Sequence, residues 1–147
     1  MNRLYPERPF VGAICVLRRA GRVLLVQRAA MPGRGLWGFP GGMQELGETV
    51  FQAAVRELEE ETGVRARPLD AIGTLDRIER DEAGRVRSHW TLVAVLAEWE
   101  RGEPDPGEDA LAVAWAAPDE VADWNGSLFP SVPLLVERAL AWREKPG

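Results

Sequence analysis

Two apolar runs near the start of the chain predict a β-hairpin. VGAICVL, residues 11–17, and RVLLVQR, residues 22–28, are rich in aliphatic and β-branched side chains, which favour strands. Ala20-Gly21 between them is a turn signal. Because both runs are apolar at nearly every position, we expect strands that are covered on both faces of their sheet.

A loop and then a helical pattern follow the hairpin. AAMPGRGLWGFPGG, residues 29–42, is dense in glycine and proline, which predicts a loop with a short extended piece at 36–39. From residue 48 to residue 62, apolar side chains recur at spacings of three and four, as on one face of a helix. These apolar residues are Phe51, Ala54, Val55 and Leu58. Gly63 is a natural end for that helix.

The next part of the chain predicts more strands. Residues 64–80 and 85–99 read as two long strands around a turn at 81–84. An acidic loop rich in proline and glycine, residues 100–109, then leads to a short strand at 111–115.

Two helices are predicted after these strands. A short one is expected at 118–124, and a longer one at 131–145 has an apolar stripe at helical spacing. Ser131 is a candidate N-cap for the longer helix, and Pro133 suits its first turn. The order of elements predicts one α/β domain, residues 1–147, with helices packed on a mixed sheet.

Composition excludes several classes of protein. The chain has 147 residues and a formal charge of −5, which argues against binding a nucleic acid through its phosphate backbone. No apolar run approaches the roughly 20 residues that span a membrane, and the polar start is no secretory signal. Cys15 is the one cysteine and lies in an apolar run, so we expect a small core residue and a cytoplasmic protein.

The predicted helix at 48–62 carries an unusual cluster of acidic residues. RELEEETG, residues 56–63, holds four glutamates. On a helical wheel Glu57, Glu60 and Glu61 share one face beside the apolar residues, while Glu59 points elsewhere. Like charges at this spacing repel, and carboxylates late in a helix meet its negative end. A solvated acidic face is the simple alternative.

A divalent cation would relieve this repulsion. Mg²⁺ or Mn²⁺ prefers carboxylate oxygens and commonly bridges to substrate phosphates. A glycine-rich loop precedes the helix, where the backbone can approach a ligand closely. The sequence therefore predicts a metal site on this helix.

The stretch around the cluster resembles the Nudix box. In GGMQELGETVFQAAVRELEEETGV the motif's fixed positions are occupied, with the spacing that the box requires. They are Gly42, Glu48, Arg56, Glu57, Leu58, Glu60, Glu61, Gly63 and Val64. The resemblance covers residues 42–64 directly. The strand order and the segment GLWGFPGG, which leads into the box, extend it over nearly the whole chain. It implies an α/β/α sandwich with a loop–helix–loop box.

The resemblance also implies roles for the residues of the box. It implies hydrolysis of a nucleoside diphosphate linked to another group, with Mg²⁺ or Mn²⁺ as cofactor. The metal ligands would be Glu57, Glu60, Glu61 and the backbone carbonyl of Gly41. Glu48 and Arg56 would hold the loop to the helix by an ion pair, with Arg56 orienting the carboxylates. Glu45 matches an acidic position of the family, with a direct or a supporting role.

The hydrolysis needs a general base to take a proton from water. Glu60 is the first candidate, because it adjoins the expected metal. In some family members a glutamate from a later loop serves instead, and Glu108 is the match here. Glu103, Asp105 and Asp109 are alternatives in that loop, and a solvated turn is the simple reading.

Several residues outside the box are candidates for substrate contacts. Trp37 or Phe39 could stack on a nucleobase, and Arg28 and Arg34 could meet phosphates. Core packing and surface ion pairs are the simpler accounts of these residues. His89, the one histidine, sits in a predicted strand, and a structural role is the simplest reading.

The resemblance implies a small nucleotide as the substrate and leaves its identity open. A loose likeness to small bacterial ADP-ribose pyrophosphatases favours ADP-ribose, although Arg80 replaces the proline that often marks that subgroup. The alternatives are a (d)NTP pyrophosphohydrolase that cleans the nucleotide pool and a nucleotide-sensing module without turnover. Many relatives are homodimers, so a homodimer is a further alternative to a monomer.

Overall fold

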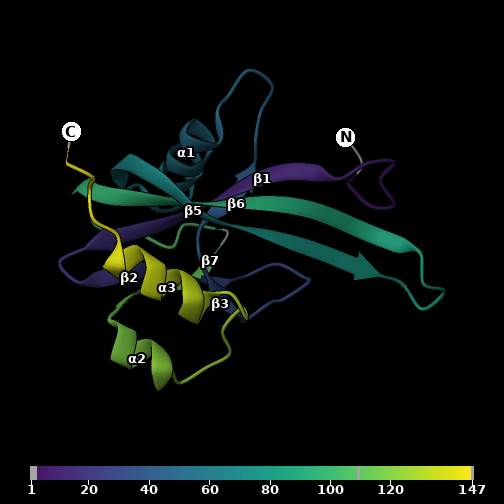
Figure 1. The fold of residues 1–147 in the computed structure, drawn as a ribbon. Helices are drawn as coiled ribbons and strands as arrows, with labels where there is room; N and C mark the ends of the chain where they lie inside the picture. The colour runs from purple at the N-terminus through teal and green to yellow at the C-terminus, as the bar shows by residue number, and fades with distance from the viewer. Residues whose placement is uncertain (1–2, 109, 147) are drawn as a thin grey trace.

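The computed structural model describes residues 3–108 and 110–146 (Figure 1). In chain order its elements are β1 (Phe10–Arg19), β2 (Arg22–Arg28), β3 (Trp37–Gly38), β4 (Gly41–Met43), α1 (Val50–Thr62), β5 (Arg65–Arg80), β6 (Val86–Arg101), β7 (Ala110–Ala116), α2 (Pro118–Ala122) and α3 (Val132–Ala141). The predicted hairpin of β1 and β2 is confirmed, as are the two long strands β5 and β6. Asp109 lies outside the described residues.

The strands form one mixed sheet centred on β1. Its main order is β3-β2-β1-β6-β5, with β4 paired to β1 and β7 paired to β2. β1 and β6 run parallel from the Phe10–Trp90 pair to the Arg18–Glu98 pair, and the other pairs are antiparallel. One edge of β1 pairs first with β4 and then with β2, so the sheet divides at this edge. The predicted mixed α/β sheet is therefore confirmed.

Helices cover both faces of this sheet. One face of β1, which includes Ile14 and Val16, packs in a core with α2 and α3. The opposite face, which includes Cys15 and Leu17, packs in a second core with α1. Cys15 is fully buried, as expected, and burial raises its pKa to about 12. In Figure 1, α1 and the pair α2–α3 lie on opposite sides of the sheet, which gives the three layers of the expected sandwich.

The ends of α1 are set by local hydrogen bonds. Thr49 accepts a bond from the backbone N–H of Gln52 at 3.1 Å, and the Gln52 side chain accepts one from the backbone N–H of Thr49 at 2.9 Å. This reciprocal capping box starts the helix two residues later than the sequence pattern predicted. Gly63 ends it in the left-handed conformation, with φ of 79°, as expected.

The buried face of α1 differs from the predicted one. Ala53, Ala54 and Leu58 are fully buried, whereas Phe51 is 36% exposed. Phe51, which the pattern placed on the apolar face of the helix with Ala54 and Leu58, is therefore not part of the core. The helix is turned so that two small alanines meet the sheet, which brings the side of Glu57 and Glu61 towards β4.

The end of the chain also differs in part from its prediction. Pro133 lies in the first turn of α3 as expected, but Ser131 makes no side-chain cap bond because its backbone is already helical, with φ of −78° and ψ of −13°. The helix ends at Ala141 and not at residue 145. Arg18 donates to the carbonyls of Ala139 and Trp142 at 2.9 and 3.0 Å. It thereby supplies hydrogen bonds to carbonyl groups at the C-terminal end of α3. None of the helices in the described part of the chain has the length and apolarity to cross a bilayer.

Candidate active site

Two glutamates of α1 lie against the glycines of β4. The backbone N–H of Gly41 donates to Glu61 Oε2 at 3.0 Å. A Cβ on Gly42 would lie 2.5 Å from the Glu57 carboxylate, so only glycine leaves room for that side chain. The ladder between β4 and β1 fixes both glycines, since Gly41 pairs with Ile14 and Gly42 with Ala13. The fold thus sets two carboxylates of the predicted metal set against β4, Glu61 beside Gly41 and Glu57 beside Gly42.

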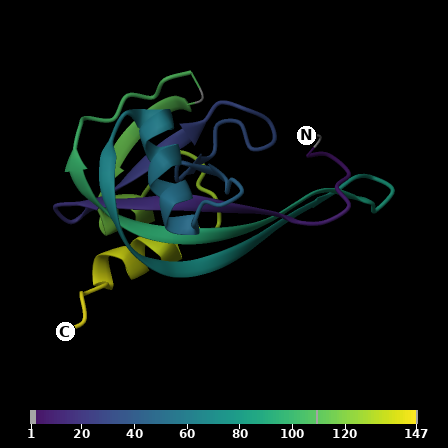
Figure 2. The same cartoon turned by 90° about the horizontal axis from the view of Figure 1, so that it is seen from above.

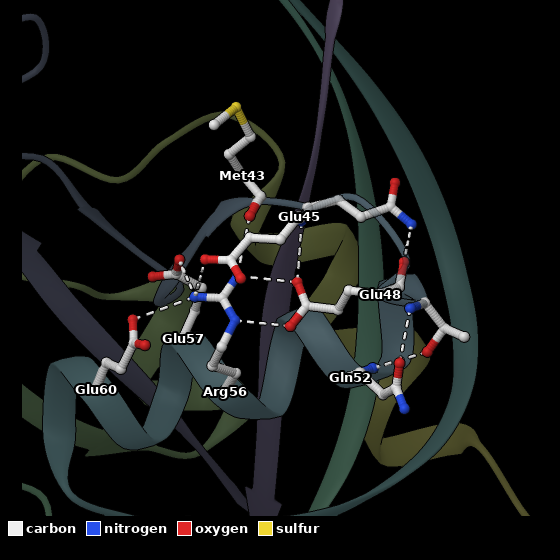
Figure 3. Close-up of polar contacts among 9 residues, drawn as sticks. Met43, Glu45, Glu48, Gln52, Arg56, Glu57 and Glu60 are labelled. Atoms are coloured by element: carbon white, nitrogen blue, oxygen red, sulfur yellow. Dashed lines mark hydrogen bonds and ion pairs between the residues drawn. The ribbon is translucent and has the colours of Figure 1, made fainter. Parts of the chain in front are cut away.

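The Arg56 guanidinium binds the other acidic residues together (Figure 3). Its Nε and Nη2 donate to the two carboxylate oxygens of Glu48 at 2.7 and 3.0 Å, and Nη2 also donates to the Met43 carbonyl at 3.0 Å. Nη1 donates to Glu57 at 2.9 Å and to Glu60 at 3.2 Å. The ion pair expected between Glu48 and Arg56 is present. It ties the loop after β4 to the middle of α1.

The exposed fractions divide the acidic side chains of the box into two kinds. The side chains of Glu48 and Glu57 are 13% and 16% exposed, whereas those of Glu45 and Glu60 are 66% and 60% exposed. Glu60 therefore has access to solvent while it stays within reach of Arg56. Glu59 points away and pairs with Arg65 at 3.1 Å, which agrees with its predicted exposed position.

The environment shifts two of these pKa values in opposite directions. Two hydrogen bonds from Arg56 lower the pKa of Glu48. Burial raises the pKa of Glu57, and the bond from Arg56 offsets only part of that effect. A desolvated carboxylate with a raised pKa lacks sufficient positive charge around it. An added cation would therefore stabilise the charged form of Glu57.

The donors present suit a hard divalent cation in their chemistry, although the side chains would have to turn to enclose one. As placed in residues 3–108 and 110–146, no three side chains of His, Cys, Asp or Glu are grouped for an ion. Glu57 and Glu60 share Arg56, and Glu61 accepts from Gly41. Carboxylate oxygens with an adjacent backbone carbonyl are nevertheless the donors that Mg²⁺ and Mn²⁺ prefer. The set fits these ions.

An open pocket of about 1050 Å³ adjoins this cluster. Its lining includes Glu48, Arg56 and Glu60 of the cluster together with Arg65 and Arg101. Since Glu60 and Arg56 border the pocket, a molecule in solution can reach the exposed side of the cluster.

The acidic loop after β6 passes the end of α1. The backbone N–H of Asp105 donates to the Thr62 carbonyl at 3.0 Å, and a Cβ on Gly107 would lie 3.3 Å from the Glu61 carbonyl. Glu108 is exposed in the turn that follows. Glu103 instead pairs with Arg19 at 2.9 Å. The loop therefore places Glu108 near the C-terminal end of α1, and its role as the base stays a prediction.

A second group of residues lies on the other face of the sheet, around the ring of Phe129. Arg77 Cζ lies 4.7 Å from the centre of this ring. A Cβ on Gly33 would be 3.2 Å from the ring and 3.6 Å from Arg28 Cδ, which places Arg28 beside the same ring. Burial, and then the charge of Arg28, lower the pKa of the Arg77 guanidinium. Two cations are thus close together, and none of the ion pairs found among the described residues gives either of them a carboxylate partner.

Sequence reasoning found Arg28 but missed Arg77 and Phe129. No local motif marks either residue, because they meet only when β5 and the segment before α3 pack together. Trp37 packs edge-on against Trp124 at 5.2 Å, and Phe39 is half-buried against the core. Both aromatic residues therefore have the packing role that was the simpler expectation, and stacking on a base is untested. Arg34 donates to the Ala29 carbonyl at 2.6 Å within its own loop.

The sheet between two helical layers, with carboxylates of a helix set against a glycine strand, defines an α/β protein with an acidic site on its first helix. Comparison with known proteins gives the family. The NUDIX domain family model matches residues 6–135, and the chain belongs to the Nudix hydrolase family.

The chain is similar to proteins of archaea and bacteria. It is 35% identical over 108 residues to an ADP-ribose pyrophosphatase of Methanocaldococcus jannaschii, an alignment that covers 74% of this chain and 61% of that protein. It is 43% identical over 125 residues to phosphatase NudJ of Escherichia coli, covering 85% and 79% of the two chains. The crystal structure of a MutT NUDIX hydrolase from Burkholderia pseudomallei matches with a TM-score of 0.76 and 33% identity, covering 90% of this chain and 98% of that one. The chain spans about three fifths of the length of the archaeal relative.

Proposed function

We propose that the protein hydrolyses a pyrophosphate bond in a nucleoside diphosphate linked to another group, with Mg²⁺ or Mn²⁺ as cofactor. The observation that carries this proposal is the pair of α1 carboxylates held against the β4 glycines. Glu57 is desolvated there beyond what Arg56 offsets, and Glu61 adjoins the Gly41 backbone. The ligands proposed for the metal are Glu57, Glu60, Glu61 and the Gly41 carbonyl.

The chain's own residues would position the reaction. Arg56 fixes the loop through Glu48 and holds Glu57 and Glu60 in a defined orientation. Glu60 is the proposed base, since it is exposed to solvent and can accept a proton from water; Glu108 is the alternative. When bound, the divalent ion neutralises phosphate charge and lowers the pKa of water. The Glu57 side chain itself is largely buried, so bulk water has little access to its carboxylate.

ADP-ribose is the substrate we favour. The archaeal relative carries the name ADP-ribose pyrophosphatase, and the two cations near Phe129 suit a substrate with a further anionic or polar end. The alternatives are a (d)NTP pyrophosphohydrolase and a nucleotide-sensing module without turnover. The acidic positions of the box are all retained, which favours an enzyme over the sensing module.

The products of the reaction separate these alternatives. Purified protein is incubated with Mg²⁺ or Mn²⁺ and either ADP-ribose or nucleoside triphosphates, and the products are identified by mass spectrometry. AMP with ribose 5-phosphate supports the favoured function. A nucleoside monophosphate with pyrophosphate supports the first alternative, and binding without products supports the second.

A pair of neighbouring substitutions tests the site. We expect Glu60→Gln to lower kcat by about 10²-fold or more, because loss of a general base removes a catalytic effect of about that size. Glu59→Gln is the matched control, since Glu59 lies on the same helix and contacts only Arg65 among the ion pairs of the described residues. It should retain activity near that of the wild type. Equal losses in the two variants, with both still folded by circular dichroism, would contradict the assignment.

A further inference from the structure

The chain between β6 and β7 passes the C-terminal end of α1. We call its residues 102–107 the capping segment, which belongs to the green loop beside that helix end in Figure 2. The backbone N–H of Asp105 donates to the Thr62 carbonyl at 3.0 Å. The last carbonyls of a helix have no partner within the helix, so this bond supplies one of them with a donor. The capping segment thus stabilises the last turn of α1 from outside the helix.

Two glycines allow the capping segment to lie close to the backbone of α1. A Cβ on Gly102 would be 3.0 Å from the Gly63 carbonyl oxygen, and one on Gly107 would be 3.3 Å from that of Glu61. Gly102 and Gly107 also have positive φ angles of 98° and 59°, which favour glycine. The capping segment therefore lies against the helix end itself, at residues that include the proposed metal ligand Glu61.

Charge opposes this position of the capping segment. The last turn of α1 holds Glu59, Glu60 and Glu61, and the C-terminal end of a helix carries a partial negative charge. The capping segment itself contains Glu103 and Asp105. Because like charges repel, the segment needs a specific attachment to stay at this helix end.

Arg19, at the end of β1, supplies such an attachment. Its Nη1 donates to Glu103 Oε1 at 2.9 Å. Its Cζ lies 3.6 Å from the centre of the Trp99 ring and 5.8 Å from that of the Trp115 ring. Trp99 Nε1 in turn donates to the Gly102 carbonyl at 2.7 Å. One guanidinium thus connects β1 to the capping segment by an ion pair and, through the stacked indole, by a second hydrogen bond.

We propose that Arg19 is a positioning residue for the metal site. By holding the capping segment on the last turn of α1, it keeps that turn helical and keeps Glu60 and Glu61 on the side of the helix from which they bind a divalent cation. Without Arg19, repulsion releases the segment and the helix end frays, so both carboxylates must be ordered again when the ion binds. The role of Arg19 rests on the proposed function, because it takes Glu60 and Glu61 to be metal ligands.

Amide hydrogen exchange tests the attachment without metal or substrate. In Arg19→Ala we expect exchange to become about tenfold faster in peptides that cover residues 60–63 and 102–107, because the helix end and the capping segment open more often. Arg22→Ala is the matched control, since Arg22 begins β2 and forms an exposed ion pair with Glu120 of α2. It should leave exchange in both regions unchanged.

Binding of Mn²⁺ without nucleotide, followed by the electron paramagnetic resonance signal of the free ion, tests the effect on the metal site. Arg19→Ala should raise the dissociation constant about tenfold, the lower end of what loss of a supporting residue around a metal costs. Loss of a positive charge alone would instead tighten the binding of a cation, so the direction of the change identifies positioning. Arg19→Lys should give an intermediate constant, because lysine keeps the ion pair with Glu103 but loses the flat stacking on Trp99. Arg22→Ala should not weaken binding.

A double substitution shows whether Arg19 acts through the capping segment. Glu103→Gln breaks the same ion pair from the side of the segment and should also weaken Mn²⁺ binding. Its addition to Arg19→Ala should change the constant little further, because both substitutions act on one attachment. Fully additive effects would show that the two residues act separately and would overturn the proposal.

Two further results would overturn the role of Arg19. The first is unchanged exchange in Arg19→Ala, and the second is faster exchange with a Mn²⁺ affinity equal to or tighter than that of the wild type. A wild-type protein that binds no Mn²⁺ would contradict the proposed function itself. The exchange result, which needs no metal, would still decide whether Arg19 holds the capping segment. Circular dichroism of each variant confirms that it is folded.

Discussion

At the scale of single residues, the site shows how one guanidinium serves two carboxylates in different ways. Glu48 receives two bonds from Arg56, whereas Glu57 receives one and is buried against β4. The hydrogen bonds dominate for Glu48 and lower its pKa, while desolvation dominates for Glu57 and raises its pKa. Glu48 therefore contributes to stability in its charged form, whereas burial disfavours the charged form of Glu57.

Replacing Glu48 by glutamine tests this division. At pH 7 we expect Glu48→Gln to lower the free energy of unfolding by about 1 kcal/mol, since a charged hydrogen-bonded pair is lost near the surface. The folded pKa of Glu48 is lowered, so its contribution is present above the ordinary glutamate pKa of about 4.3 and is lost as pH falls through the folded pKa. Urea unfolding at a series of pH values should show the two proteins converging at acid pH.

A neighbouring glutamate supplies the control for that experiment. Glu45 lies 3.8 Å from Arg56 and its side chain is 66% exposed, so Glu45→Gln should change stability little at any pH. A difference between wild type and Glu48→Gln that stays constant down to the lowest pH would contradict the role assigned to its charge.

Gly42 and Glu57 offer a second test at this scale. A methyl group at residue 42 would lie 2.5 Å from the Glu57 carboxylate, so Gly42→Ala should lower the free energy of unfolding by about 1 to 3 kcal/mol. In a Glu57→Ala background the obstructing carboxylate is gone, and the same change should cost little. Urea unfolding of the four proteins measures this coupling. Additive effects would show that the two side chains are not in contact.

At the scale of elements, periodicity predicted most of the fold, because long strands and helices each average over many residues. The hairpin of β1 and β2, the pair β5 and β6, and the helix α1 all follow from it. For these elements, the errors in the predicted bounds lie at their ends. Ser131 fails as a cap because its backbone is already helical, and α1 starts where the Thr49–Gln52 box places it. The Thr49–Gln52 capping box has a recognisable sequence pattern, so this helix start could have been predicted.

The part of the site on β4 was less accessible to sequence reasoning. A strand of three residues, Gly41–Met43, has no period to detect, and its pairing with β1 is a long-range contact. The acidic residues of α1 were found from the sequence because residues three or four positions apart lie on the same face of a helix. The exposure of Phe51 was missed because apolar character alone does not show which side of a helix meets small side chains on the sheet.

At the scale of the whole molecule, one short segment connects the two groups of candidate residues. A Cβ on Gly38 would lie 2.7 Å from Phe129, and one on Gly42 would touch Glu57. Four residues of chain span at most about 14 Å. The Phe129 group and the acids of α1 are therefore joined by one short segment of chain, although they belong to opposite faces of the sheet.

This arrangement predicts that Arg77 contributes to substrate binding and not to chemistry. With ADP-ribose as substrate, we expect Arg77→Gln to raise KM about tenfold while kcat changes little, because an ionic contact remote from the reacting phosphorus acts equally on the ground state and the transition state. Arg67→Gln, on the same strand but outside this group, is the control and should leave both constants unchanged. Steady-state kinetics at fixed Mg²⁺ provides the measurement. A fall in kcat at constant KM would place Arg77 in the catalytic step, and unchanged kinetics would remove the Phe129 group from the substrate's path.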